Sequence, residues 1–212
     1  MGSARQDKPN QRERRRLETK ARIIEATIRS IGAQGPAGAS MGSIMRQAGI
    51  SRGLVGYHFG SKGNLLAAAF QRLCDDYRAM LGIGRDQQTS VGEDPEGELH
   101  VVIRRCFEWP AAYRDRQYAW FGFWALARTE PELRAVNRQI NDEAAAHLGA
   151  LLAAAGARRG QVVNEARAGR ELAATIDGAW LHLTTGVESF TAEQAVTMCQ
   201  QYAERLLERD WG

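Results

Sequence analysis

The stretch Ser51–Lys62, SRGLVGYHFGSK, decides the fold class, because it predicts the second helix of a helix-turn-helix. Ser51 is a good helix N-cap, and Gly60 can adopt the left-handed conformation that ends a helix. The helix between them is barely two turns long. The apolar residues that we expect to pack inward are Leu54, Val55 and Phe59.

A second short helix is predicted directly before this one, at residues 40–48, because its apolar residues fall on one face. Gly49 ends that helix. Two short helices joined around Gly49 are typical of a helix-turn-helix, whose second helix enters the major groove of DNA. Similar helix pairs occur in proteins that never bind DNA, so the spacing alone leaves both interpretations open.

The second helix presents several side chains that would be available to DNA, namely Arg52, Gly53, Tyr57 and His58. Ser61 then caps a third helix that begins at Lys62. An ammonium beside a helix N-terminus suits a contact with a phosphate, so Lys62 joins the candidate DNA contacts.

The charge of the chain is divided unevenly. Residues 1–65 hold 12 Lys and Arg against 4 Asp and Glu, a balance of +8. The rest of the chain has a balance of −5, which gives the net charge of +3. The basic end is therefore the end with the helix-turn-helix. Clustered cations gain affinity for a polyanion by releasing its counterions, which favours a nucleic acid as partner. The alternative for the run of arginines at 12–16 is a solvated tail.

The composition predicts an ordinary folded protein, because 212 residues with 44% apolar side chains can fill a core. The three cysteines, Cys74, Cys106 and Cys199, are too scattered for a disulfide framework or a metal site. No apolar run approaches the ~20 residues that span a bilayer, and no signal-peptide core follows the basic N-terminus. We therefore expect a cytoplasmic protein without membrane contact.

Helical periodicity continues through the whole chain, without a convincing strand. We expect an all-α fold of about nine helices, with a flexible basic arm at 1–11, a three-helix DNA-binding domain at 12–62, a connecting helix at 63–82 and an effector-binding and dimerisation domain at 83–212. The expected helices lie at 12–35, 40–48, 51–60, 62–81, 98–109, 113–128, 131–155, 165–186 and 191–209, with one substantial loop at 82–97.

Two of the expected helix starts carry a capping-box pattern, Thr129 with Glu132 and Thr191 with Gln194. The last two helices contain small residues that allow close packing. Together with the same helices of a second chain they could form a four-helix dimer interface, although an internal core explains the pattern equally well.

The ordered features resemble the TetR family of one-component transcription regulators. The resemblance rests on IIEA at 23–26, on ISRGLV at 50–55 and on YHFGSKGNLL at 57–66. The C-terminal half resembles the BetI-like branch of that family, which includes a choline-responsive regulator, through WFGFWA at 120–125, PEL at 131–133 and IDGAWL at 176–181.

The resemblance implies a homodimer that binds a palindromic DNA operator, represses transcription in the free state and is released by a small-molecule effector. Carried over by position, Arg52, Tyr57, His58 and Lys62 become DNA contacts, and Ser40 or Ser43 reaches a phosphate. Gly56 departs from the family pattern, because many relatives have Tyr there. An interior Gly costs roughly 0.5–1 kcal/mol of helix stability, so either the backbone approaches DNA closely at Gly56 or Tyr57 supplies the missing contact.

The effector site is predicted from an unusual load of aromatic side chains in one domain. Aromatic faces attract cations by up to about 2 kcal/mol when desolvated, and a carboxylate would add to this attraction. A quaternary ammonium or another cationic effector follows as a hypothesis, with a plain aromatic core as the alternative. The candidate residues are Trp109, Trp120, Phe121, Trp124, Asp177 and Trp180.

Two other functions remain as alternatives. An all-helical enzyme has little support, since the four histidines lie far apart and no Walker loop, zinc motif or nucleophile elbow is present. We expect no catalytic residues, metal or cofactor. A redox-sensing regulator would act through Cys74, Cys106 or Cys199, but nothing in the sequence marks any of them as a thiol of low pKa.

Overall fold

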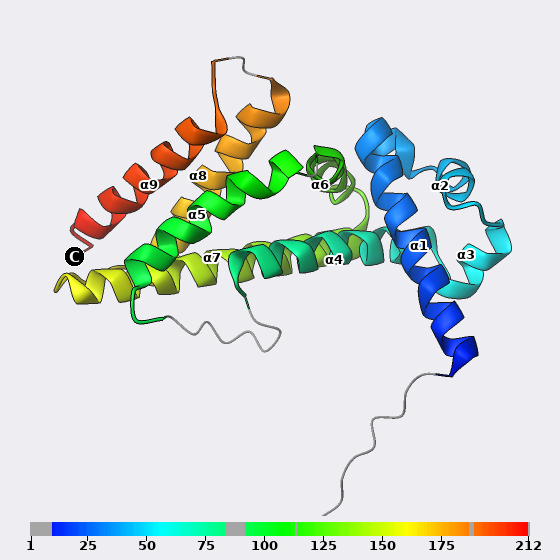
Figure 1. Ribbon diagram of the computed structural model, residues 1–212, viewed down its shortest axis with the longest axis horizontal. Coiled ribbons are helices and arrows are strands. Elements are labelled where there is room, and N and C mark those ends of the chain that lie inside the picture. The colour runs from blue at the N-terminus through cyan, green and yellow to red at the C-terminus, as the bar shows by residue number, and fades with distance from the viewer. Residues whose placement is uncertain (1–9, 84–91, 113, 187–188, 212) are drawn as a thin grey trace, which may run out of the picture.

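The computed structural model describes residues 10–83, 92–112, 114–186 and 189–211. Within these ranges the chain forms nine α-helices and one short 3-10 helix, with no strand (Figure 1). The prediction of an all-α fold with about nine helices is confirmed. None of the described helices is long and apolar enough to cross a bilayer. The predicted arm at 1–11 lies outside the described residues, apart from its last two positions.

The N-terminal part consists of four elements, which are α1 (Gln11–Gln34), η1 (Gly35–Ala39), α2 (Met41–Ala48) and α3 (Arg52–Phe59). Local sequence explains their ends. The side chain of Asn10 accepts a hydrogen bond from the Glu13 amide, and the side chain of Ser40 accepts one from the Ser43 amide. Gly49 follows α2 in the left-handed conformation, which a residue without Cβ adopts at low cost.

A small core holds these helices together, and its buried members are Ile23, Ile44, Val55, Phe59 and Leu65. The expectation that Leu54 packs inward is wrong, because its side chain is 38% exposed. Val55 and Phe59 lie four residues apart on the inner face of α3, and Leu54 lies beside that face rather than on it.

Helix α4 (Lys62–Leu81) belongs to both parts of the molecule. Leu65 completes the small core, whereas Leu66, Phe70 and Leu73 are buried in a second, larger core. The two domains are therefore joined by one continuous helix, whose first turn belongs to the small core and whose remainder belongs to the larger one.

The larger core is built mainly from α4 and five further helices, which are α5 (Pro95–Ala112), α6 (Arg114–Leu126), α7 (Pro131–Arg158), α8 (Glu165–Thr185) and α9 (Ala192–Glu208). Ile28 and Ile31 of α1 are also buried in it. Helix α5 starts three residues before the expected position, and α7 ends three residues after it. Gly149 and Gly169 let α7 and α8 approach closely, since a Cβ on Gly169 would lie 2.0 Å from the carbonyl oxygen of Ala145.

One of the two predicted capping boxes is confirmed. Thr191 and Gln194 exchange side-chain and backbone hydrogen bonds at the start of α9. The box predicted at Thr129 is wrong, because Pro131 is the first residue of α7 and makes Glu130 the N-cap. The hydroxyl of Thr129 donates instead to the carbonyl of Leu126.

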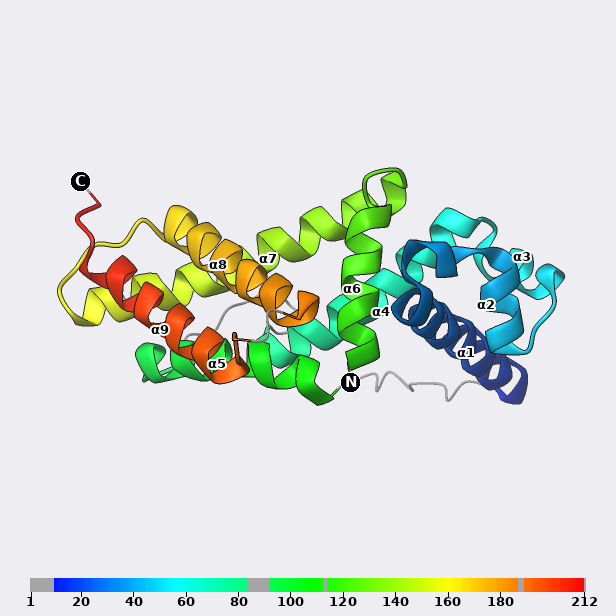
Figure 2. The ribbon, with the colours of Figure 1, turned by 90° about the horizontal axis from the view of Figure 1, so that it is seen from above.

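Helix α6 stands between the DNA-binding part and the rest of the molecule. In Figure 2 it lies directly beside α1, with α5, α8 and α9 on its other side. Any movement within the larger core that displaces α6 therefore acts on α1.

Candidate nucleic-acid interface and ligand cavity

The turn between α2 and α3 has the geometry of a helix-turn-helix. Gly49 adopts φ 61° and ψ 43°, and its amide donates to the carbonyl of Arg46. The amide of Ile50 donates to the carbonyl of Met45 at 3.2 Å, which reverses the chain before α3. Ser51 occupies the N-cap position, although its side chain makes no capping hydrogen bond.

The outer face of α3 carries the side chains that the sequence assigns to DNA. Arg52, Gly53 and Gly56 are exposed, and Tyr57 is 71% exposed, an unusual position for a large aromatic residue. A Cβ on Gly56 would meet no atom within 4 Å, so the backbone there is open to a partner. Such an exposed aromatic and cationic face is typical of a binding surface.

His58 lies at the edge of this face and is half-buried. Its ring packs edge-on against Tyr57, with 5.2 Å between the ring centroids. Partial burial and the nearby cations Arg16 and Lys20 lower the pKa of His58 below its ordinary value. The free imidazole is therefore neutral at pH 7 and offers DNA one donor and one acceptor rather than a charge.

The two serines proposed for a phosphate contact differ in exposure. Ser40 is exposed at the start of α2. Ser43 is only 3% exposed, and its hydroxyl forms hydrogen bonds with Ser30 and Gln34. The prediction of a DNA contact by Ser43 is wrong, because this hydroxyl is used inside the domain. It fixes α2 against α1.

Lys62 is exposed as the first residue of α4. The hydroxyl of Ser61 accepts a hydrogen bond from the Asn64 amide at 3.1 Å, which caps the helix. The ammonium therefore lies beside a helix N-terminus, where the helix dipole adds to its attraction for an anion.

A cavity of about 280 Å³ lies between α4, α6, α7 and α8. This volume lies just below the about 300–1,000 Å³ of sites for drug-sized ligands, so it suits a smaller molecule. The sequence singled out Trp120, Asp177 and Trp180 among its lining residues. The remaining lining residues are Tyr77, Asn141, Asp142, Ala144, Ala145, Arg170, Ala173 and Ala174.

Three aromatic rings form one wall of this cavity. The centroid of Trp120 lies 5.2 Å from that of Tyr77 and 6.0 Å from that of Trp180, and the two indoles meet edge to face. The indole nitrogen of Trp180 donates to the carbonyl oxygen of Cys106 at 2.7 Å, which fixes that ring. Trp120 in turn packs against this fixed ring and against Tyr77.

Asp177 is one of two carboxylates that line the cavity, the other being Asp142. Among the described residues no hydrogen bond or ion pair reaches Asp177, so it satisfies neither a helix end nor a buried donor. Burial raises the pKa of Asp177 to about 6. A largely buried carboxylate kept without a partner costs stability, and carboxylates of this kind occur mainly where function requires them.

Three of the predicted effector residues do not line the cavity. Phe121 and Trp124 do not line it: Trp124 packs edge-on behind the cavity residue Trp120 at 6.4 Å, and Phe121 packs against Trp124 at 5.3 Å. The side chain of Trp109 lies outside the described part of the structure. Tyr77 was missed because its place in the apolar stripe of α4 has the same periodicity as a core residue.

The thiols of the chain are all buried and unpaired. Burial raises the pKa of Cys74 and of Cys199 to about 12, and it raises the pKa of Cys106 further. The thiolate, which is the reactive form, is therefore negligible at neutral pH. These properties argue against the redox-sensing alternative.

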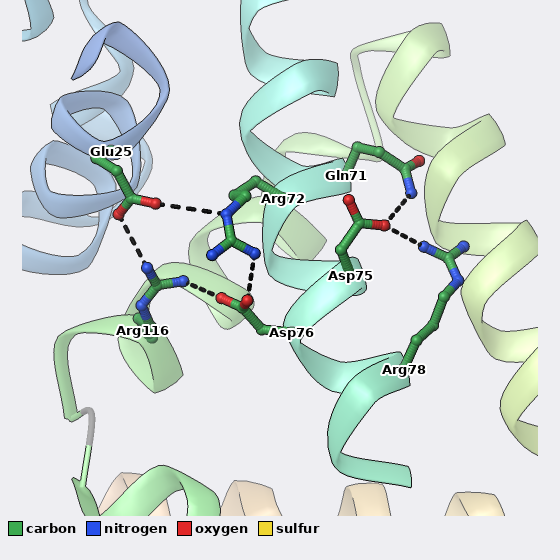
Figure 3. A network of polar contacts seen from close by, with 7 residues as sticks. All are labelled: Glu25, Gln71, Arg72, Asp75, Asp76, Arg78 and Arg116. Atoms are coloured by element: carbon green, nitrogen blue, oxygen red, sulfur yellow. Dashed lines mark hydrogen bonds and ion pairs between the residues drawn. The ribbon is translucent and has the colours of Figure 1, made fainter. Parts of the chain in front are cut away.

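An ion-pair cycle connects the cavity helices to the DNA-binding part (Figure 3). Arg116 of α6 donates to Glu25 of α1 at 2.9 Å and also pairs with Asp76 of α4. Arg72 of α4 closes the cycle by pairing with Asp76 and by lying 3.7 Å from Glu25. The cycle is half-buried, so water screens it less than a fully exposed ion pair.

Glycines bring α1 and α6 into close contact. A Cβ on Gly32 would lie 2.3 Å from the carbonyl oxygen of Asp115, and a Cβ on Gly122 would lie 2.4 Å from the Cγ2 atom of Ile31. Neither position tolerates a side chain without movement of a helix or of a buried isoleucine. The two domains therefore meet along a tight helix pair.

An exposed recognition helix, joined through tightly packed helices to a domain with a ligand cavity, defines a ligand-responsive DNA-binding regulator. Comparison with known families agrees. Residues 95–208 match the family of BetI-type transcriptional repressors in its C-terminal domain, and residues 23–69 match the bacterial regulatory proteins of the tetR family. The chain belongs to the TetR family of transcriptional regulators and has a BetI-type C-terminal domain. Its relatives are regulators, so the enzyme alternative is excluded.

Individual relatives extend over most of the chain. The chain is 30% identical over 192 residues to the HTH-type transcriptional regulator BetI of Burkholderia mallei, which covers 89% of this chain and 93% of the relative. It is 29% identical over 182 residues to BetI of Pseudomonas fluorescens, with coverage of 86% and 89%.

Solved structures share the fold. A transcriptional regulator from Pseudomonas aeruginosa has a TM-score of 0.78 at 25% identity and covers 91% of each chain. A transcriptional regulator from Saccharomonospora viridis, solved in complex with choline, has a TM-score of 0.72 at 21% identity and covers 89% of this chain and 96% of its own.

Proposed function

We propose that this regulator responds to a small cationic effector, of the quaternary ammonium class, that binds in the cavity beside Asp177. The observation that carries the proposal is the unpaired carboxylate of Asp177 in a cavity walled by Tyr77, Trp120 and Trp180. A cation there would pair with the carboxylate and lie against aromatic faces, two interactions that strengthen when water is excluded. The choline complex of the Saccharomonospora viridis neighbour supports the same ligand class.

The effector would act on DNA binding through α4 and α6. Tyr77 on α4 and Trp120 on α6 line the cavity, whereas Asp76 and Arg116 on the same helices belong to the ion-pair cycle with Glu25 of α1. A ligand that separates or rotates the two rings would shift Arg116, and α1 would move with it. DNA binding responds only if the ligand favours one arrangement of α1 over the other.

We further propose a homodimer formed by α8 and α9, bound to a palindromic operator and released by the effector. Two apolar residues of these helices, Leu181 and Met198, are 49% and 38% exposed. Gly178 lies on the same outer face, where a Cβ would meet no atom within 4 Å. A face of small and apolar residues suits the self-complementary packing of a two-fold dimer. We expect a Gly178→Arg variant to become monomeric by light scattering while it keeps its helical circular dichroism.

The first experiment selects the bound sequence from random DNA and then measures its affinity for the purified protein. Arg52, Gly53, Tyr57, His58 and Lys62 are the proposed contacts, with Ser40 as a phosphate contact. We expect affinity to fall steeply with salt, and Arg52→Ala or Lys62→Ala to weaken binding strongly. Affinity that does not change with salt would contradict an electrostatic interface.

The second experiment tests the effector class with choline, glycine betaine, tetramethylammonium and spermidine, using dimethylbutanol as the neutral isostere of choline. A cation present at a concentration of 100 times its Kd should raise the free energy of unfolding by about 2.7 kcal/mol and should weaken operator binding. Glycine betaine is included because Arg170, which lines the cavity, would donate hydrogen bonds to its carboxylate. If dimethylbutanol acts as well as choline, or if none of the cations acts, the cationic site is rejected.

A further inference from the structure

The first turns of α1 form a cationic ridge that the proposed DNA contacts do not include. Between residues 11 and 20 the chain has five cationic side chains against two carboxylates. Three of the cations, Arg12, Arg16 and Lys20, are exposed and recur every four residues, so they lie along one side of the helix. We call these three residues the α1 ridge.

The α1 ridge continues the face of α1 that packs on the recognition helix. Ile23, on the same side of α1 as Arg16 and Lys20, is fully buried in the small core with Val55 and Phe59 of α3. The ammonium of Lys20 lies 5.8 Å from the centroid of the Phe59 ring. The cations are therefore aligned with the recognition helix by the packing of the core itself.

Helix α1 reaches past the compact part of the DNA-binding domain. Figures 1 and 2 both show its N-terminal end extending beyond α2 and α3. At 1.5 Å per residue, Arg12 and Lys20 lie about 12 Å apart along the helix axis. Among the described residues, no carboxylate forms an ion pair with any member of the ridge, so its charge is available to an external anion.

We propose that the α1 ridge is a second DNA-binding surface, in which Arg12, Arg16 and Lys20 contact backbone phosphates flanking the base pairs read by α3. The partner is duplex DNA, because Lys20 lies against Phe59, the last residue of the recognition helix. Its contacts carry no sequence information, since they reach phosphates rather than base edges. The inference rests on the proposed operator binding and extends the expected footprint beyond the recognition helix.

The test compares operator affinity across a salt series for the wild type, Arg12→Ala/Arg16→Ala and Arg12→Lys/Arg16→Lys. Arg138→Ala serves as the control, since Arg138 is an exposed cation of α7, outside the DNA-binding domain. Each lost phosphate contact lowers the slope of log affinity against log salt by about 0.9. We expect the double alanine variant to lose about 30-fold per subunit at 0.15 M salt, on operator and scrambled duplex alike, and the lysine variant to recover most of that loss.

A second arm shortens the operator from its outer ends while the selected base pairs stay intact. The wild type should then fall to the affinity of the double alanine variant, which should itself change little. The inference is overturned if the alanine variant matches Arg138→Ala in affinity and slope, or if its loss is confined to the operator. If the wild type binds no duplex at all, the operator proposal fails first and the ridge with it.

Discussion

The guanidinium of Arg116 donates a 2.9 Å hydrogen bond to the carboxylate of Glu25, which joins a helix that lines the ligand cavity to the first helix of the DNA-binding domain. Arg116 lies one helical turn before Trp120, a wall of the cavity. Glu25 lies two residues after Ile23, which is buried in the small core with α3. This ion pair therefore joins the cavity to the DNA-binding domain, beside the continuous helix α4 and the apolar packing of α1 on the larger core.

Glu25→Gln should reduce the response to the effector while leaving DNA binding intact. Coupling between two sites is typically worth about 1–3 kcal/mol, so loss of this contact should lower the effector-induced change in operator affinity by roughly fivefold or more. The measurement is operator affinity with and without saturating effector. Glu204→Gln is the matched control, because Glu204 pairs with Arg159 at 2.8 Å far from α1. Equal responses in the two variants would show that the Arg116 pair transmits nothing.

Gly122→Ala should destabilise the protein, because the new Cβ would lie 2.4 Å from the Cγ2 atom of the fully buried Ile31. Overpacking of this kind costs about 1–3 kcal/mol, more than the roughly 0.5–1 kcal/mol that alanine gains over glycine in a helix. Gly56→Ala is the control, because a Cβ there meets no other atom and the variant gains only the higher helix propensity of alanine. Denaturant unfolding of both variants without DNA measures the difference, and similar stabilities would mean that α1 and α6 separate at no cost.

Asp177→Asn should raise stability above pH 6 and abolish the response to cations. The folded pKa of about 6 lies above the ordinary value of 3.8, so the folded state favours the protonated carboxyl. The wild type therefore loses stability as pH rises from about 4 through 6, by up to about 3 kcal/mol. The variant should melt several degrees higher at pH 7.5 and equally at pH 4. A lower melting temperature at pH 7.5 would indicate a structural partner for Asp177.

Cation affinity should depend on pH through the same carboxyl. Below pH 6 the carboxyl is protonated in the free protein, so affinity for choline should fall by up to about tenfold per pH unit. Calorimetric titration between pH 5 and 8 checks this, and binding at pH 6 should release protons into the buffer. Affinity that is flat over this range would place the cation elsewhere.

Gly56→Tyr should weaken operator binding by roughly tenfold or more without lowering the free energy of unfolding. The open space at Gly56 allows the backbone of α3 to approach DNA, and a large side chain would hold it away. Gly56→Ala should have a smaller effect. Unchanged affinity and unchanged sequence preference would show that the departure from the family pattern has no consequence for binding.

The sequence by itself determined the helices, because apolar periodicity, caps and glycine stops are local signals. The cap at Ser61, the stop at Gly49 and the capping box at Thr191 all behave as their sequences predict. The exposed candidates Arg52 and Tyr57 also follow from the face of one short helix. Local patterns failed where a competing local group intervened, as when Pro131 moved the N-cap from Thr129 to Glu130.

Only the tertiary structure decided which side chains meet. The run WFGFWA at 120–125 places Trp120 and Trp124 on one side of α6, and only the packing decides that Trp120 reaches the cavity while Trp124 lies behind it. Ser43 is buried because α1 lies across it, and Arg116 finds Glu25 because Gly32 and Gly122 let two helices touch. These contacts join residues up to 91 positions apart, and no helical period encodes the distance between two helices.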